Sequence, residues 1–137
     1  MKRNNPFFAK LLIFLSNYHI PVLGKLVRII LNSDIYCKLP KSVYMGHPYG
    51  IVIHSKTIIG ENVTIMQHVT IGTRNEHEDD APVIGDNVFI GAGAKIIGNV
   101  IVGDNVKIGA NAIVTRTIPP NCTVINANVI LKKDTSK

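Results

Sequence analysis

Apolar residues recur every six positions over most of the chain. A second small or apolar residue stands four positions after each of them, and glycine often follows the first directly. A period of six fits neither an α-helix nor a hairpin, because side chains repeat every 3.6 residues in a helix and every two in a strand. It predicts short strands joined by tight turns. The leading residues are Ile53, Ile59, Ile65, Ile71, Ile84, Ile90, Ile96, Val102, Ile108 and Val114.

Three such strands form one triangular coil of about eighteen residues, and stacked coils hydrogen-bond to each other about 4.8 Å apart. The turns contain "GEN" at 60–62 and "GDN" at 85–87 and 103–105. These residue types adopt backbone conformations that other residues resist. The sequence therefore predicts an all-β fold, a parallel β-helix of about four coils over residues 43–125, followed by a tail at 126–137.

The first 42 residues have a helical pattern instead. Apolar residues lie at helical spacing before Pro21 and again after it, which predicts two short amphipathic helices. The apolar run "LLIFL" is too short to span a bilayer. We expect the helices to pack on the coils or on a neighbouring subunit, and association with a membrane surface is the less favoured alternative. The apolar positions are Phe7, Phe8, Leu11, Leu12, Leu15, Val22, Leu23, Leu26, Val27 and Ile30.

Composition narrows the class of protein. The 137 residues make one domain with 46% hydrophobic and 18% charged residues, which indicates a compact fold with the capacity to self-associate. Cys37 and Cys122 have no metal-ligand or redox spacing, so we expect reduced thiols in the cytoplasm. The net charge is +6, and residues 1–41 hold seven Lys or Arg and one acid, Asp34. A basic chain suggests an anionic partner, which could be nucleic acid, a membrane or a phosphate-bearing cofactor. Nucleic acid is the least favoured of the three, because zinc-finger spacing and aromatic-basic interleaving are missing.

His47 breaks the apolar pattern at the head of the repeat. It stands between Gly46 and Pro48, one step of six before Ile53, where an apolar leading residue is expected. An imidazole titrates near neutral pH and serves well as a general base. The alternative is a structural histidine at the end of a coil.

The stretches "GHPYGIVI", "VTIMQHVTIG" and "VFIGAGAKIIGNVIVGDNVKIGANAIV" together resemble the hexapeptide-repeat acyltransferases. The likeness covers residues 34–125 and is closest to the serine acetyltransferases and their polysaccharide-pathway relatives. It implies a left-handed β-helix, a homotrimer with active sites between subunits, and acetyl transfer from acetyl-CoA to a hydroxyl. Because the helical segment is shorter than that of serine acetyltransferases, we expect a trimer and not a hexamer.

The same resemblance suggests roles for individual residues. His47 matches the family's general base, and Asp34 resembles the aspartate that orients it, with a helix terminator or cap as the alternative. Ala92 and Ala110 match small residues along which the pantetheine arm lies, although a tight coil also demands small residues. Two further candidates for the cofactor are Thr115 and Arg116.

The chain's end and its one loop depart from the family pattern. Lys132, together with Lys133, is expected to meet the cofactor's phosphates, but "NANV" at 126–129 replaces the family's Gly-x-Pro-Ala segment. The loop "TRNEHEDDAP" at 73–82 interrupts the repeat, and family members extrude a loop over the active site here. A solvated insertion without a substrate role is the alternative.

The acceptor is inferred from these departures. Asp80 and Ala81 stand before Pro82, where serine acetyltransferases carry Arg-His, and Gly46 stands where they carry Asp. An acidic loop repels a free carboxylate, so the sequence favours a hydroxyl of a sugar or glycan precursor, with L-serine as the alternative. Asp80 and Tyr49 are the candidate acceptor-binding residues.

Two other classes of protein agree less well with the sequence. The γ-class carbonic anhydrases are zinc trimers built on the same repeat, but spacings of 7, 14 and 9 between successive histidines from His47 to His77 do not reproduce their ligands, so no metal is expected. His54, His68 and His77 are expected at the surface. A non-catalytic β-helix scaffold gives no reason for His47 or for the small residues of the late coils.

Overall fold

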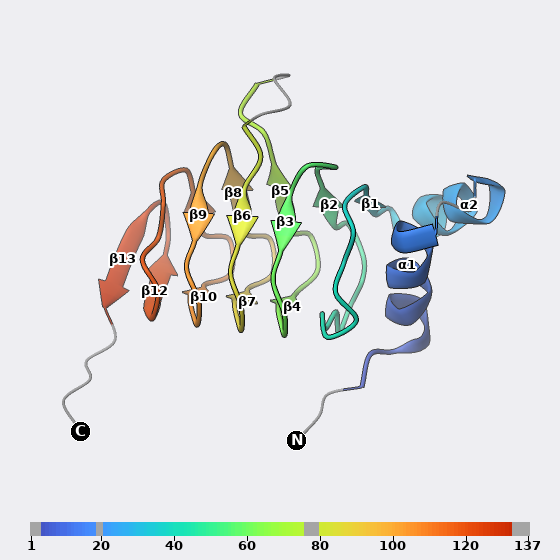
Figure 1. Cartoon of the computed structure of the whole chain (residues 1–137), viewed down its shortest axis with the longest axis horizontal. Helices are drawn as coiled ribbons and strands as arrows, with labels where there is room; N and C mark the ends of the chain where they lie inside the picture. The colour runs from blue at the N-terminus through green and yellow to red at the C-terminus, as the bar shows by residue number, and fades with distance from the viewer. Residues whose placement is uncertain (1–3, 19–20, 76–79, 133–137) are drawn as a thin grey trace.

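The computed structural model describes residues 4–18, 21–75 and 80–132. Two helices, α1 (Phe7–Tyr18) and α2 (Pro21–Leu31), precede a series of short strands. Figure 1 shows the strands stacked as coils, with both helices at one end and the C-terminal strands at the other. Within the described residues, neither helix is long and apolar enough to cross a membrane.

The strands form three sheets, one on each side of the coil. Sheet A contains β1 (Asp34–Ile35), β2 (Val52–Ile53), β5 (Thr70–Gly72), β8 (Lys95–Ile97) and β11 (Ile113–Val114). Sheet B contains β4 (Thr64–Ile65), β7 (Phe89–Ile90), β10 (Lys107–Ile108), β12 (Cys122–Ile125) and β13 (Val129–Lys132), and sheet C contains β3 (Ile58–Ile59), β6 (Val83–Ile84) and β9 (Ile101–Val102). The strand pairs are parallel except for β12 with β13. The predicted parallel β-helix with an N-terminal helical segment is confirmed.

The leading residues of the repeat form the core. Ile53 lies in register with Ile71, Ile71 with Ile96, and Ile96 with Val114, and all four are fully buried. Burying each of these side chains contributes roughly 1.5–3 kcal/mol relative to leaving it exposed. The second residues of the repeat are buried beside them, among them Val63, Val69, Val88, Ala94, Val106 and Ala112.

Each coil turns at three corners, which we name by the sheets they join. At the CB corner the asparagines at 62, 87 and 105 adopt φ angles of 56°, 55° and 58°, which explains the repeated "GEN" and "GDN". The aspartates of these turns bridge neighbouring coils, since the Glu61 N–H donates to Asp86 Oδ1 and the Asp86 N–H to Asp104 Oδ1, both at 2.8 Å. The corner sequence therefore also joins one coil to the next.

The register expected for His47 is wrong. Tyr44 bridges to Thr64, so Met45 is the residue above Ile65, and Met45 is fully buried. The step from Met45 to Ile53 is eight residues where the repeat predicts six. His47 falls in the extra length, at the corner and on the surface. Sheet A also begins earlier than residue 43, because Asp34 and Ile35 of β1 pair with β2.

Burial also determines the state of the thiols. Cys37 and Cys122 are free and buried. Loss of solvation raises the pKa of the Cys37 thiol to about 12, which keeps it protonated and unreactive at neutral pH. Neither cysteine therefore has the exposed thiolate that nucleophilic catalysis requires.

Gly91 tests the tightness of the corners. A Cβ added there would lie 2.6 Å from the backbone nitrogen of Ala110, whereas one added at Gly72 would meet nothing within 4 Å. We expect Gly91→Ala to lower the free energy of unfolding by about 1–3 kcal/mol through overpacking. Gly72→Ala is the matched control and should change it by less than about 0.5 kcal/mol. Equal losses in urea unfolding would contradict the stacked geometry.

Candidate active site

His47 lies on the corner of the first coil between sheets B and A, the BA corner. Its side chain and that of Tyr49 are exposed, while Pro48 between them is buried. The Tyr49 N–H donates to the carbonyl oxygen of His47 at 2.9 Å, which closes a tight turn. The two extra residues of this corner thus anchor the loop through Pro48 and hold the imidazole outside the coil.

Ser33 ties this loop to the helical segment. Its side chain is 1% exposed, and its hydroxyl lies 3.0 Å from the Pro48 carbonyl oxygen and accepts a hydrogen bond from the Ile51 N–H at 3.0 Å. The Gly50 N–H donates to the Leu31 carbonyl at the end of α2. The His47 loop is therefore held on both sides of the imidazole by the segment that follows α2.

Asp34 lies next to this loop along the backbone, and the described chain shows no ion pair between its carboxylate and the imidazole. Its N–H donates to the Ile51 carbonyl at 2.8 Å, and its side chain is exposed. Within the described residues its carboxylate has no hydrogen bond to His47. The end of α2 is formed by Asn32, which has a φ of 47°, and by the Ser33 N–H, which donates to the Arg28 carbonyl. An orienting role for Asp34 remains a prediction.

The BA corners of the following coils continue the same edge. The backbone bonds run from corner to corner: the His68 N–H donates to Tyr49 O, the Gly93 N–H to Gln67 O, and the Asn111 N–H to Ala92 O. Ala92 is half-buried and Ala110 is exposed. The BA corners therefore form one edge of the molecule. His47 and Tyr49 lie at its start, and Ala92 and Ala110 lie on later coils along it.

Three residues on this edge were not predicted to contribute. His68 has a φ of 58°, and its ring covers Gly50, where an added Cβ would lie 2.3 Å from Nδ1. Lys95 Nζ donates to the carbonyls of His68 and Gly93 at 3.0 and 2.9 Å. The Oε1 of Gln67 is buried with no hydrogen-bond partner in the described chain. The available signal was "MQH" at a turn where later coils have "GAG" and "GAN".

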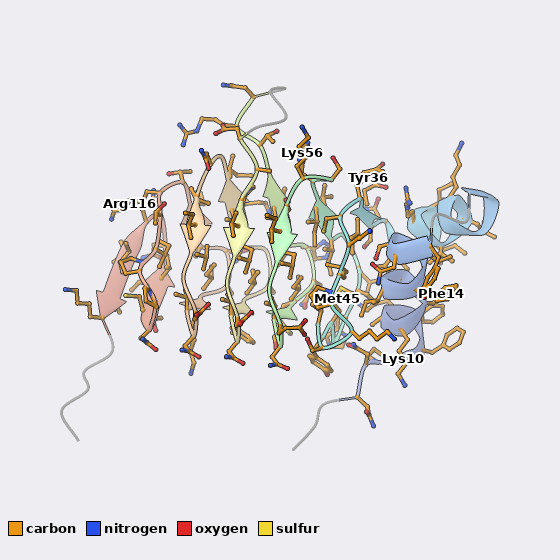
Figure 2. The ribbon with its side chains drawn as sticks, in the orientation of Figure 1. Lys10, Phe14, Tyr36, Met45, Lys56 and Arg116 are labelled. Carbon is orange, nitrogen blue, oxygen red and sulfur yellow. The ribbon has the colours of Figure 1, made fainter. Side chains whose placement is uncertain are left out.

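The remaining predicted residues lie elsewhere on the chain. Asp80, Thr115 and Arg116 are at the AC corner, on the opposite edge of sheet A from His47. Asp80 Oδ1 accepts from the Asn99 N–H at 2.9 Å, which fixes the end of loop 73–82. Arg74 at the start of this loop donates to the Thr115 carbonyl at 3.2 Å. Figure 2 shows Arg116 on the late coils, away from Met45 of the first coil.

The C-terminal tail occupies part of the predicted cofactor region. The Thr115 N–H donates to Asn128 Oδ1 at 2.9 Å, and Arg116 donates to the Asn128 carbonyl. Lys132 is exposed on β13, in register with Cys122. Lys133 and His77 lie outside the described residues. No group of three His, Cys, Asp or Glu side chains in the described chain is arranged to hold a metal ion.

Comparison with known proteins identifies the repeat. Residues 81–116 match the bacterial transferase hexapeptide family of six repeats. The chain is 44% identical over 99 residues to a serine acetyltransferase of Staphylococcus aureus, covering 71% of this chain and 46% of that protein. The chain thus contains a hexapeptide repeat and resembles the serine acetyltransferases. A serine acetyltransferase of Staphylococcus epidermidis is 41% identical over 107 residues, 76% of this chain and 50% of that protein.

Solved structures agree with this hexapeptide-repeat resemblance. The serine acetyltransferase of Vibrio cholerae superimposes with a TM-score of 0.70 at 29% identity, over 94% of this chain and 53% of that one. Serine acetyltransferase 1 of Entamoeba histolytica, in complex with L-cysteine, gives 0.69 at 31% identity over 84% and 50%. The chain spans about half the length of the curated relatives it matches. The expected resemblance is confirmed.

Ser33→Ala tests the anchoring of the His47 loop. It removes a buried hydroxyl and leaves the Pro48 carbonyl and the Ile51 N–H without this partner, so we expect the free energy of unfolding to fall by roughly 1–3 kcal/mol. Ser55→Ala, at an exposed serine, is the control and should have almost no effect. Urea unfolding of both variants measures the difference, and an unchanged Ser33→Ala midpoint would show that the hydroxyl does not hold the loop.

Proposed function

We propose that the chain is an acetyl-CoA-dependent O-acetyltransferase whose acceptor is L-serine. The observation that carries this proposal is the 44% identity to a serine acetyltransferase over 71% of the chain. The exposed imidazole of His47, at the head of an edge with short side chains, supports it. We further propose a cytoplasmic enzyme with a left-handed coil of about four turns.

His47 acts as the general base in this proposal. Its imidazole removes the proton of the acceptor hydroxyl as that oxygen attacks the thioester carbonyl, and then returns the proton to the departing thiolate of CoA. Such catalysis contributes typically 10²–10⁴-fold to the rate. Asp34, on the neighbouring strand, would orient the ring and favour the imidazolium.

The BA edge suits the pantetheine arm of acetyl-CoA. Ala92 and Ala110 present only methyl groups there, so an extended chain can approach the backbone amides. Thr115, Arg116 and Lys132 would hold the cofactor's remaining polar groups. Because Thr115 and Arg116 lie at the AC corner, we propose a homotrimer in which one subunit's BA edge faces the AC edge of the next.

Arg74 supplies a cation for the carboxylate of serine. It is an exposed side chain at the base of loop 73–82, held by a hydrogen bond to the Thr115 carbonyl. A guanidinium has five N–H donors, so this bond leaves others for a bidentate contact with a carboxylate. The Arg-His pair expected before Pro82 is missing, and Arg74 at the other end of the loop takes over its task.

A sugar or glycan precursor is the second candidate acceptor. It is favoured by the acidic residues of loop 73–82, which repel a free carboxylate, and by Gly46 beside the base. Tyr49, exposed beside His47, offers an aromatic face and a hydroxyl to either acceptor.

Release of CoA thiol from acetyl-CoA, measured with serine, homoserine, amino sugars and nucleotide sugars, tests the function. We expect turnover with serine that His47→Ala reduces by about 10² or more. Asp34→Asn should lower kcat by about tenfold with little change in KM. Lys107→Ala, at an exposed side chain of sheet B away from the BA and AC edges, is the control and should keep its activity. Turnover with a sugar but not with serine would show that the acceptor is a sugar. Failure to bind acetyl-CoA would contradict the enzyme and favour a non-catalytic scaffold.

The role of Arg74 is tested by substituting it with glutamine. Loss of the carboxylate partner should raise the KM for serine by about tenfold or more, while kcat changes little. The control is Lys107→Gln, which removes an exposed cation from sheet B. An unchanged KM would remove Arg74 from the acceptor site without affecting the role of His47.

A further inference from the structure

The N-terminal helices each carry a second apolar face that the coils do not cover. In α1, Ala9, Leu12 and Leu15 are buried against the rest of the protein. Phe7, Phe14 and Tyr18 lie on a different face, seven and four residues apart, and all three are exposed. Figure 2 shows Phe14 on the side of α1 that points away from the coils.

Helix α2 repeats this arrangement. Val27 and Leu31 are buried, whereas Leu26, Ile29 and Ile30 are more than half exposed. Soluble proteins commonly place polar residues on the outer face of a surface helix, so two neighbouring helices with apolar outer faces indicate a binding surface. We call these exposed residues of α1 and α2 the outer helical face.

Charge identifies what this face binds. The chain has fifteen Lys or Arg and nine Asp or Glu; residues 1–41 hold seven of the bases and one of the acids, leaving eight of each in the rest. The entire net charge of +6 therefore belongs to the segment that carries the outer helical face. No acid precedes Asp34. A second copy of this segment would bring like charges together, whereas an anionic surface complements them.

A cavity on α1 combines both properties. It has a volume of about 400 Å³ and is lined by Lys10 and Lys41 together with Phe14 and Tyr18, whose rings are stacked with centroids 4.6 Å apart. Lysine side chains bind phosphate groups, and aromatic rings sit favourably at the boundary between lipid headgroups and acyl chains. Cationic and apolar groups thus meet at one place, as in helices that lie in a membrane interface.

We propose that the outer helical face docks on the surface of a bilayer containing anionic phospholipids. The helices lie in the interface without crossing it, with the aromatic and aliphatic side chains among the upper acyl groups and the lysines at the phosphates. Both helices are at the end of the coil stack that holds the first coil (Figure 1), so docking brings the His47 corner close to the membrane surface. The inference stands independently of the acetyl transfer.

Co-sedimentation of the full chain with vesicles tests the proposal. We expect binding to vesicles of phosphatidylcholine and phosphatidylglycerol in equal parts, and at least tenfold weaker binding to phosphatidylcholine alone or at high salt. Phe14→Ser combined with Ile29→Ser should weaken binding to the anionic vesicles by about tenfold or more. Lys10→Gln combined with Lys41→Gln should act similarly at low salt.

Matched controls separate docking from general stickiness. Val129→Ser with Leu131→Ser removes two apolar side chains of 43% and 49% exposure from β13, at the opposite end of the molecule, against 47% and 67% for Phe14 and Ile29. This control should bind as the wild type does, with circular dichroism showing that all variants are folded. Equal binding by the helix variant, or no binding to anionic vesicles, would overturn the proposal. If the helix variant instead sediments as a smaller oligomer than the wild type without lipid, the outer helical face binds a second copy of the chain and the proposal is wrong.

Discussion

The close stacking of coils at their corners is the constraint on which the rest of the structure depends. Each corner must reverse the chain in a few residues while the backbone of the next coil lies directly beneath it. An added Cβ at Gly60 or Gly85 would meet an aspartate oxygen of the next turn at 2.4 Å, and the asparagines at 62, 87 and 105 take left-handed φ angles. The isoleucine ladder is continuous only because these corners keep every strand in register.

The same constraint explains why the candidate base, His47, stands where the repeat is relaxed. At regular corners the side chains are short or lie against the neighbouring coil, as those of Asp86 and His68 do, and the later BA corners carry alanine. The first corner is two residues longer, which buries Pro48, exposes His47, and allows Ser33 to fix the loop from the helical segment. On its outer side this corner meets the end of α2 and β1 instead of another regular corner, so the extra residues have no corner of the same length to match there. The position of His47 is thus a consequence of its place at the end of the stack.

The ladder was predictable because a six-residue apolar period has a single structural explanation, and the glycine and asparagine corners agreed with it. The register before Ile53 was not predictable, because an insertion in one corner leaves the six-residue period intact on one side and shifts it on the other. Met45 is itself apolar, so the sequence carries no sign that it, and not His47, is the core residue. The pairing of Asp34 with Val52 was also hidden, because a two-residue strand after a helix has no pattern of its own. Contacts of Lys95 and Gln67 depend on stacking, which the linear sequence does not display.

Sequence and structure lead to different interpretations of Asp80, the residue on which the choice of acceptor depended. From the sequence, Asp80 was a free negative charge beside the expected substrate, and it argued against serine. In the structure its carboxylate accepts the Asn99 N–H, so the residue has a structural task in closing the loop. A carboxylate already bonded to a backbone amide, in a solvent-exposed loop, repels a distant substrate weakly because water and salt screen it. Arg74, attached to Thr115 across the base of the same loop, retains free donors. Of the two described charges of this loop, Arg74 is thus better placed than Asp80 to act on a carboxylate, which supports the proposal of serine as the acceptor.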